Sequence, residues 1–362
     1  MKGSGLRAQG SGTGRAAATL RSRYAERCGA KASGAGVGPR AINKCLALVG
    51  LSVLLAGGFA RAASAQDTRL LVISGVGGDD EHTAQFHKWA DLVIDGSKKS
   101  GLPEADITYL ADAPEQDAAH KAARSTKENI AKAFADITAK SKPGDEVFVL
   151  LIGHGSFDGK EAAFNIPGPD MTASDFGLFL DKLSSQRIIF VNTASSSGPF
   201  ADVLKKTGRT IVTATKTGGE HNEPRFAGYF IEALASDEAD RDRNGRVSVG
   251  EAFDYATAKV KDAYDKEHHI QTEHSVLEDG SQGKLAATLF LAPDKAKAAL
   301  AQTTDPAMRA LFEEQAAINR DIEALRLKKD GMDPAEYDRQ FEKLATDLAL
   351  KTKEIRDRGA QK

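Results

Sequence analysis

The chain has very little cysteine. Of its 362 residues only Cys28 and Cys45 are cysteines, and both lie within the first 65 residues. If this segment is removed, the remaining chain has no disulfide, no thiolate metal ligand and no cysteine nucleophile.

The chain also lacks an apolar run of the ~20 residues that a membrane-spanning helix needs. Its longest run, residues 45–60 with residues 46–56 at its centre, follows Arg40 and Lys44 and precedes an A-x-A cleavage pattern at Ala63-Ser64-Ala65. This order predicts a Sec-type signal peptide over residues 1–65, and hence a secreted or periplasmic protein. Two alternatives stay open: an uncleaved membrane anchor, and a true start within residues 1–36.

The charge of the chain is divided between two parts. The formal net charge is −2, but residues 1–65 carry ten Lys or Arg and one Glu. The remainder therefore holds 39 basic and 50 acidic residues, a net charge of −11. Such an acidic body argues against nonspecific binding to nucleic acid.

Residues 66–300 alternate short apolar runs with helical patterns. This alternation is typical of βαβ units, so it predicts an α/β fold with a mostly parallel sheet and helices on both faces. The runs predict strands at residues 69–74, 107–110, 146–152, 162–164, 187–191, 210–215 and 285–291.

Two of these predicted strands end in small residues. Residues 146–152 lead into Gly153-His154-Gly155, and residues 187–191 lead into a turn that contains Ser195. Ligands and nucleophiles of open α/β sheets lie where strand carboxyl ends meet helix amino ends. His154 is therefore a candidate general base, and Ser195 a candidate nucleophile.

The loop 218–226 follows the next strand and is expected to overhang the same crevice. A solvated loop that caps the following helix is an equal alternative, in which His221 is a surface residue. Together with the two strand ends, this loop gives four further crevice residues: Asn192, Ser197, Glu220 and His221.

The segments Gly153-His154-Gly155-Ser156 and Ala194-Ser195-Ser196-Ser197-Gly198 resemble the two motifs of the caspase-like clan (clan CD) of cysteine peptidases, and its legumain branch most. The resemblance covers about residues 68–235. It implies a legumain-like peptidase domain that takes a polypeptide as substrate or ligand. It also implies that His154 is the catalytic histidine and that Ser195 stands in place of the catalytic cysteine.

A serine at the nucleophile position leaves three functions open. A thiol is partly ionised near neutral pH, whereas a hydroxyl needs a well-placed base. We therefore favour a catalytically inactive binding or scaffold module. The alternative is a hydrolase in which His154 activates Ser195, and backbone N–H groups near Gly155 and Ser195 hold the oxyanion. A third function is that of a calcium-dependent structural protein.

Residues 240–251 match the calcium loop of an EF-hand position by position. The pattern predicts a structural Ca²⁺ site of low affinity, on the order of 10⁻⁴–10⁻³ M. The alternative is an Asx-rich turn that caps the next helix without metal. The oxygen ligands would come from Asp240, Asp242, Asn244, the Arg246 carbonyl, Ser248 and Glu251, with Gly245 at the turn.

Residues 301–362 follow a boundary at Pro293 and carry two heptad seams. The first seam runs from Leu311 to Leu325, and the second from Tyr337 to Ile355. Such seams predict a helical hairpin or coiled coil. Self-association through these C-terminal helices is the alternative to packing within one chain.

Overall fold

A computed structural model describes residues 67–116, 119–183, 186–236, 238–242, 244, 246–291, 299 and 303–359, except for the side chain of Asp330. The chain divides into two compact units, residues 1–64 and 65–362. The predicted signal peptide and Gly245 lie outside the described residues.

A seven-stranded sheet forms the centre of the second unit, with the strand order β10-β9-β8-β4-β1-β2-β3. All neighbours pair in parallel except β10 and β9, which are antiparallel. The predicted mostly parallel sheet is therefore confirmed. Its strands are β1 (Thr68–Ser74), β2 (Ile107–Ala111), β3 (Ala123–Arg124), β4 (Glu146–Ile152), β8 (Arg187–Asn192), β9 (Arg209–Thr213) and β10 (Val276–Glu278).

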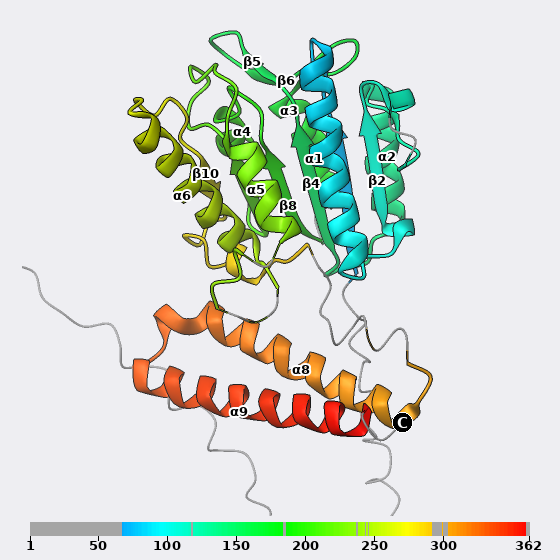
Figure 1. Cartoon of the computed structure of the whole chain (residues 1–362), viewed down its shortest axis with the longest axis vertical. Helices are drawn as coiled ribbons and strands as arrows, with labels where there is room; N and C mark the ends of the chain where they lie inside the picture. Colours follow the sequence, from blue (N-terminus) through cyan, green and yellow to red (C-terminus); the bar gives the residue numbers. More distant parts are fainter. Residues whose placement is uncertain are drawn as a thin grey trace, which may run out of the picture. The chain divides into compact units, whose positions relative to one another are not determined.

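Helices cover both faces of this sheet, as predicted (Figure 1). The central strands are almost entirely apolar because both of their faces are buried. One face packs against α1 (Asp80–Lys99), α5 (Phe226–Ala235) and α6 (Val249–Glu267). The other face packs against α2 (Lys127–Lys140), α3 (Ala173–Leu180) and α4 (Pro199–Leu204).

A small antiparallel sheet follows the carboxyl end of β4. It consists of β5 (Gly155–Phe157), β6 (Ala162–Phe164) and β7 (Met171–Thr172). The remaining short elements are 3₁₀ turns: η1 (Glu104–Asp106), η2 (Pro114–Gln116), η3 (Asp181–Leu183), η4 (Ala286–Thr288) and η5 (Lys329–Gly331).

The predicted strand over residues 285–291 is wrong. Ala286–Thr288 is a 3₁₀ turn, and Phe290 makes only an isolated bridge with Ser248. The carboxylate of Asp279 accepts the backbone N–H groups of Ser281, Gly283 and Ala286, which folds this segment into a tight turn. Among the described residues the last strand is β10.

Two long helices, α8 (Pro306–Lys328) and α9 (Pro334–Gly359), form the C-terminal part and pack against each other. Ile322 and Leu325 of α8 are buried. The Nζ atom of Lys351 lies 2.6 Å from a carboxylate oxygen of Glu314, so polar contacts flank the apolar seam. None of the helices among the described residues is long and apolar enough to cross a membrane.

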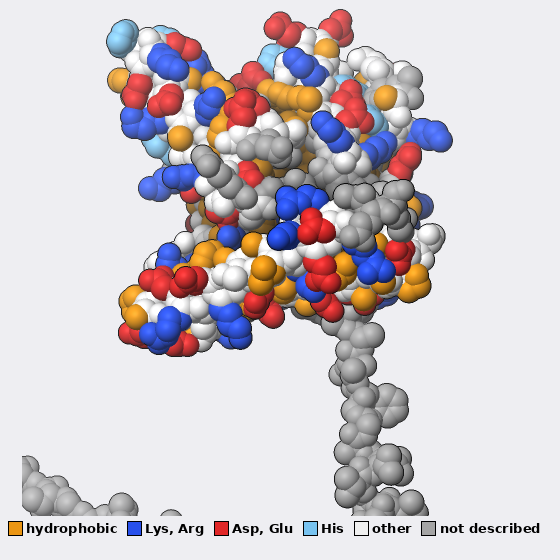
Figure 2. All heavy atoms as spheres, turned by 60° about the horizontal axis from the view of Figure 1, so that its bottom comes forward, with side chains coloured by type: hydrophobic (Ala, Val, Ile, Leu, Met, Phe, Trp, Pro, Cys, Tyr) orange, Lys and Arg blue, Asp and Glu red, His pale blue; other side chains and the backbone are white. Residues whose placement is uncertain are grey.

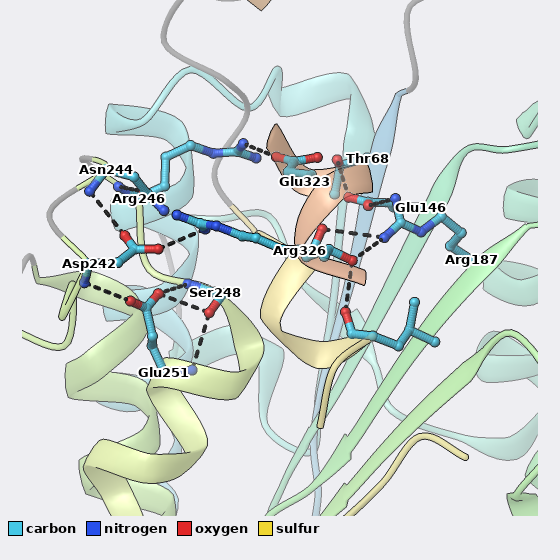
Figure 3. A network of polar contacts seen from close by, with 12 residues as sticks. Thr68, Glu146, Arg187, Asp242, Asn244, Arg246, Ser248, Glu251, Glu323 and Arg326 are labelled. Carbon is cyan, nitrogen blue, oxygen red and sulfur yellow. Dashed lines mark hydrogen bonds and ion pairs between the residues drawn. The ribbon is translucent and has the colours of Figure 1, made fainter. Parts of the chain in front are cut away.

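Polar side chains gather where β1, β4 and β8 begin, at the end of the sheet opposite to the crevice (Figure 3). Glu146 is buried, and its Oε1 lies 3.2 Å from Nη1 of Arg187. Arg246 pairs with Glu323 of α8 at 3.1 Å, and Arg326 of α8 pairs with Asp242 at 2.7 Å. Two ion pairs therefore connect α8 to the 240–251 loop: the loop supplies the arginine of one pair, and α8 supplies the arginine of the other.

Burial raises the pKa of Glu146 above its usual value, although Arg187, Arg246 and Thr68 act in the opposite direction. The folded protein thus holds this proton more tightly than the unfolded chain does. The contribution to stability is present at low pH and is lost as the pH rises above about 4.3, the ordinary pKa of Glu.

We predict that Glu146→Gln removes this pH-dependent loss of stability. Urea unfolding between pH 4 and pH 8 is expected to show a free energy of unfolding that falls less steeply with rising pH than in the unchanged chain. Glu104→Gln, at an exposed glutamate, is the control and is expected to leave the slope unchanged. A slope that Glu146→Gln does not alter would contradict the prediction.

Candidate functional site

The carboxyl ends of β4 and β8 meet at one edge of the sheet. The two strands pair in register up to Leu151 and Asn192, and Thr193 then donates both its N–H and its hydroxyl to the carbonyl of Leu151. The residues that follow each strand are thereby held side by side, which is the arrangement that the sequence predicts for His154 and Ser195.

His154 lies between β4 and β5 and turns toward α1. Its Nε2 lies 3.2 Å from the carbonyl oxygen of Gly77, and its ring packs on His82 and Phe86 with centroid distances of 5.0 and 5.2 Å. A carbonyl can only accept, so Nε2 carries the proton in this contact, and Nδ1 is the accepting nitrogen of the neutral ring.

Ser195 is only 4% exposed, and its hydroxyl contacts the backbone of Gly155. Its Oγ donates to the Gly155 carbonyl at 3.1 Å and accepts the Gly155 N–H at 3.3 Å. Among the hydrogen bonds of the described residues, none joins Ser195 to His154. The structure therefore brings Ser195 to the residue after the candidate base, and not to its imidazole.

Ser196 makes a contact that the sequence analysis missed. Its Oγ lies 2.9 Å from Nδ1 of His221, and its N–H donates to the carbonyl of Glu220 at 2.9 Å. Its φ of 54° lies in the left-handed region, which is uncommon outside glycine. The tight turn after β8 and the 218–226 loop are therefore fixed to each other through Ser196.

The other predicted crevice residues have structural contacts. Asn192 accepts the N–H of Ala194, and Ser197 lies 3.2 Å from the hydroxyl of Thr215. The carboxylate of Glu220 accepts the backbone N–H groups of Lys216 and His274. These side chains hold the loops that surround the crevice.

His82 is a further residue of this edge that the sequence analysis missed. Its two ring nitrogens lie 2.8 Å from Asp79 and 3.0 Å from Glu223, so it links the start of α1 to the 218–226 loop. These hydrogen bonds raise the pKa of His82 above its usual value, and the bond to Asp79 has the larger effect. A helix-capping Asp three residues before a histidine was the available signal, but the partner Glu223 is distant in sequence.

The 240–251 loop brings three carboxylates together. Oxygens of Asp240, Asp242 and Glu251 lie within 4.8 Å of one another. Glu251 also accepts the backbone N–H groups of Arg241, Asp242 and Ser248, and it forms a capping box with Ser248 at the start of α6. The donor set is composed of oxygens, the ligand type that Ca²⁺ prefers.

The fold and the crevice define a class of protein: an α/β domain with a mostly parallel sheet whose histidine and small-residue turn lie at one strand edge. The model of the peptidase C13 family, the legumain family, matches residues 93–279. The chain belongs to this family.

Among solved structures, a crystal structure of a Geobacter sulfurreducens protein is similar at 12% sequence identity. The match covers 58% of this chain and 92% of that chain, with a TM-score of 0.36. This likeness adds nothing to the family match. No match was found among the curated proteins.

The close approach of Gly155 to the turn after β8 leads to a prediction. A Cβ at Gly155 would lie 2.3 Å from the carbonyl oxygen of Ser195, whereas a Cβ at Gly219 would meet only Thr217 Oγ1 at 3.7 Å. We expect Gly155→Ala to lower the free energy of unfolding by about 1–3 kcal/mol, because the backbone must move.

Denaturant unfolding measures this difference, with Gly219→Ala as the matched control. The control is expected to change the free energy of unfolding by less than about 0.5 kcal/mol. Equal effects of the two substitutions would contradict the close contact between Gly155 of β5 and the carbonyl of Ser195.

Proposed function

We propose that the chain is an exported, non-catalytic member of the peptidase C13 family. It binds a polypeptide in the crevice and uses its C-terminal helices for assembly. Export is supported by the apolar run at residues 46–56 and the A-x-A pattern that ends at Ala65.

The observation that carries this proposal is the engagement of the Ser195 hydroxyl. A nucleophilic serine needs its hydroxyl proton directed at a base, whereas the Ser195 proton is directed at the Gly155 carbonyl. The His154 ring is turned to Gly77. With both side chains held elsewhere, the activated pair that hydrolysis needs is not formed, which supports a binding role over a catalytic one.

Turnover of a fluorogenic peptide library and of simple esters, with calcium present, tests this proposal. We expect the unchanged chain to show no more turnover than buffer. Ser195→Ala, Ser196→Ala and His154→Ala are expected to be indistinguishable from it. Ser195→Cys is the informative gain-of-function variant, because a thiol ionises far more readily than a hydroxyl.

Turnover that disappears in both Ser195→Ala and His154→Ala would overturn the proposal and establish a serine–histidine hydrolase. Turnover that disappears in Ser196→Ala and His221→Ala would also overturn it. That result would assign the chemistry to the Ser196–His221 hydrogen bond, whose distance is 2.9 Å.

We also propose that the 240–251 loop binds a structural Ca²⁺. The grouping of Asp240, Asp242 and Glu251 within 4.8 Å supports this proposal, since a divalent cation would offset the repulsion between these carboxylates. The ion would hold the start of the loop to the first turn of α6, through Glu251.

Calorimetric titration with CaCl₂ and thermal unfolding test this site. At ten times the dissociation constant, calcium is expected to stabilise the fold by about 1.4 kcal/mol. Glu251→Gln is expected to weaken binding at least tenfold. Asp254→Asn, at a nearby exposed carboxylate, serves as the control. Absence of heat and of stabilisation up to 10 mM CaCl₂ would reject the site and leave the loop as a helix cap.

A further inference from the structure

The helix α9 packs against α8 along one side. Lys351 and Thr352 contact Glu314 and Gln315 of α8, and Tyr337 is buried near the start of α9. Next to this contact, one flank of α9 is hollowed into a shallow groove, which we call the α9 groove. It is lined by Phe341, Glu342, Ala345, Thr346, Ala349, Leu350 and Lys353. Its residues Phe341, Ala345 and Ala349 also line a cavity that α8 borders.

The α9 groove leaves an apolar side chain in solvent. Leu350 is 62% exposed, although it lies beside two small residues, Ala345 and Ala349, that offer space to a larger side chain. Apolar side chains reach the surface between charged ones along these C-terminal helices (Figure 2). An exposed leucine next to a hollow of small residues is a surface that another helix can cover.

The charges at the rim of the groove identify the partner. Glu342 lies at one end and Lys353 at the other, and among the described residues neither has an ion-pair partner. The large Leu350 and the small Ala345 are likewise separated along the helix. Both complementary pairs, Glu342 with Lys353 and Ala345 with Leu350, are centred on the same point between Asp347 and Leu348.

We infer that the partner is a second copy of this chain, whose α9 lies antiparallel to the first. A two-fold axis between Asp347 and Leu348 places each Leu350 over the partner's Ala345. It also places each Glu342 opposite the partner's Lys353. This inference rests on the assembly role proposed for the C-terminal helices and names the surface and the partner that fulfil it.

The self-complementary pattern favours a second copy over an unrelated helix. A two-fold interface uses the same patch on both subunits, so each favourable pair must occur twice about one centre. If the partner were an unrelated helix, there would be no reason for the charged pair, Glu342 and Lys353, and the large-and-small pair, Leu350 and Ala345, to share one centre. The antiparallel direction follows from the charges, since a parallel pair in register would place Glu342 beside Glu342.

Sedimentation velocity of the purified chain, over a range of concentrations, tests the inference. We expect a dimer that Leu350→Lys weakens at least tenfold in dissociation constant. Lys353→Glu is expected to weaken it by less, and the double variant Glu342→Lys/Lys353→Glu is expected to restore it. Leu178→Lys is the matched control, because Leu178 is 67% exposed on α3 and lies outside the α9 groove.

A monomer at every concentration would overturn the inference. So would a dimer whose dissociation constant Leu350→Lys does not change, or a dimer that the control Leu178→Lys also dissociates. Failure of the double variant to restore the dimer would overturn the antiparallel register. None of these results depends on turnover, so the peptide and ester assays fail or succeed separately from this test.

Cross-linking resolves the direction of the helices. In a background with Cys28 and Cys45 replaced by Ser, Thr346→Cys would lie about 5 Å along the axis from its counterpart, and Ala335→Cys about 37 Å. A short bis-maleimide is expected to join Thr346→Cys chains and to leave Ala335→Cys chains separate. Efficient cross-linking at both positions would instead show a parallel pair.

Discussion

The parallel pairing of β4 and β8 is the constraint on which the crevice depends. The two strands run in register to Leu151 and Asn192, and Thr193 continues the contact with two hydrogen bonds to the Leu151 carbonyl. The chain after β4 is therefore pressed against the chain after β8. Only glycine fits at position 155, because a Cβ there would lie 2.3 Å from the Ser195 carbonyl oxygen. The same closeness lets the Gly155 backbone engage the Ser195 hydroxyl.

The two ends of β4 have opposite chemistry. At its carboxyl end the polar groups are small side chains and backbone atoms, and Ser195, Ser196 and Ser197 are buried there. At its amino end Glu146 is buried with Arg187, close to the ion pairs that connect α8 to the 240–251 loop (Figure 3). An ion pair at this depth adds little net stability but strongly favours one arrangement, because a lone buried charge is costly.

The sequence patterns predicted the elements whose pattern reflects burial, and they failed where a single polar side chain determines the backbone conformation. The apolar runs of β1, β4 and β8 predict buried parallel strands, since both faces of such strands are covered. Residues 285–291 have the same appearance, yet the Asp279 carboxylate turns them into a 3₁₀ segment. At the start of α2, Thr126 is the cap, and its neighbour Ser125 donates its hydroxyl to the carbonyl of Ser74.

By itself the sequence determined the α/β class, the parallel sheet and the family. It also placed His154 and Ser195 at strand ends on one edge, because period and composition report which residues are buried. Only the tertiary structure decided what these side chains contact. The proton of the Ser195 hydroxyl is directed at Gly155, His154 contacts Gly77 and His82, and Ser196 contacts His221. Hydrogen bonds between loops depend on rotamers and on distances within a few tenths of an ångström, which no sequence period encodes.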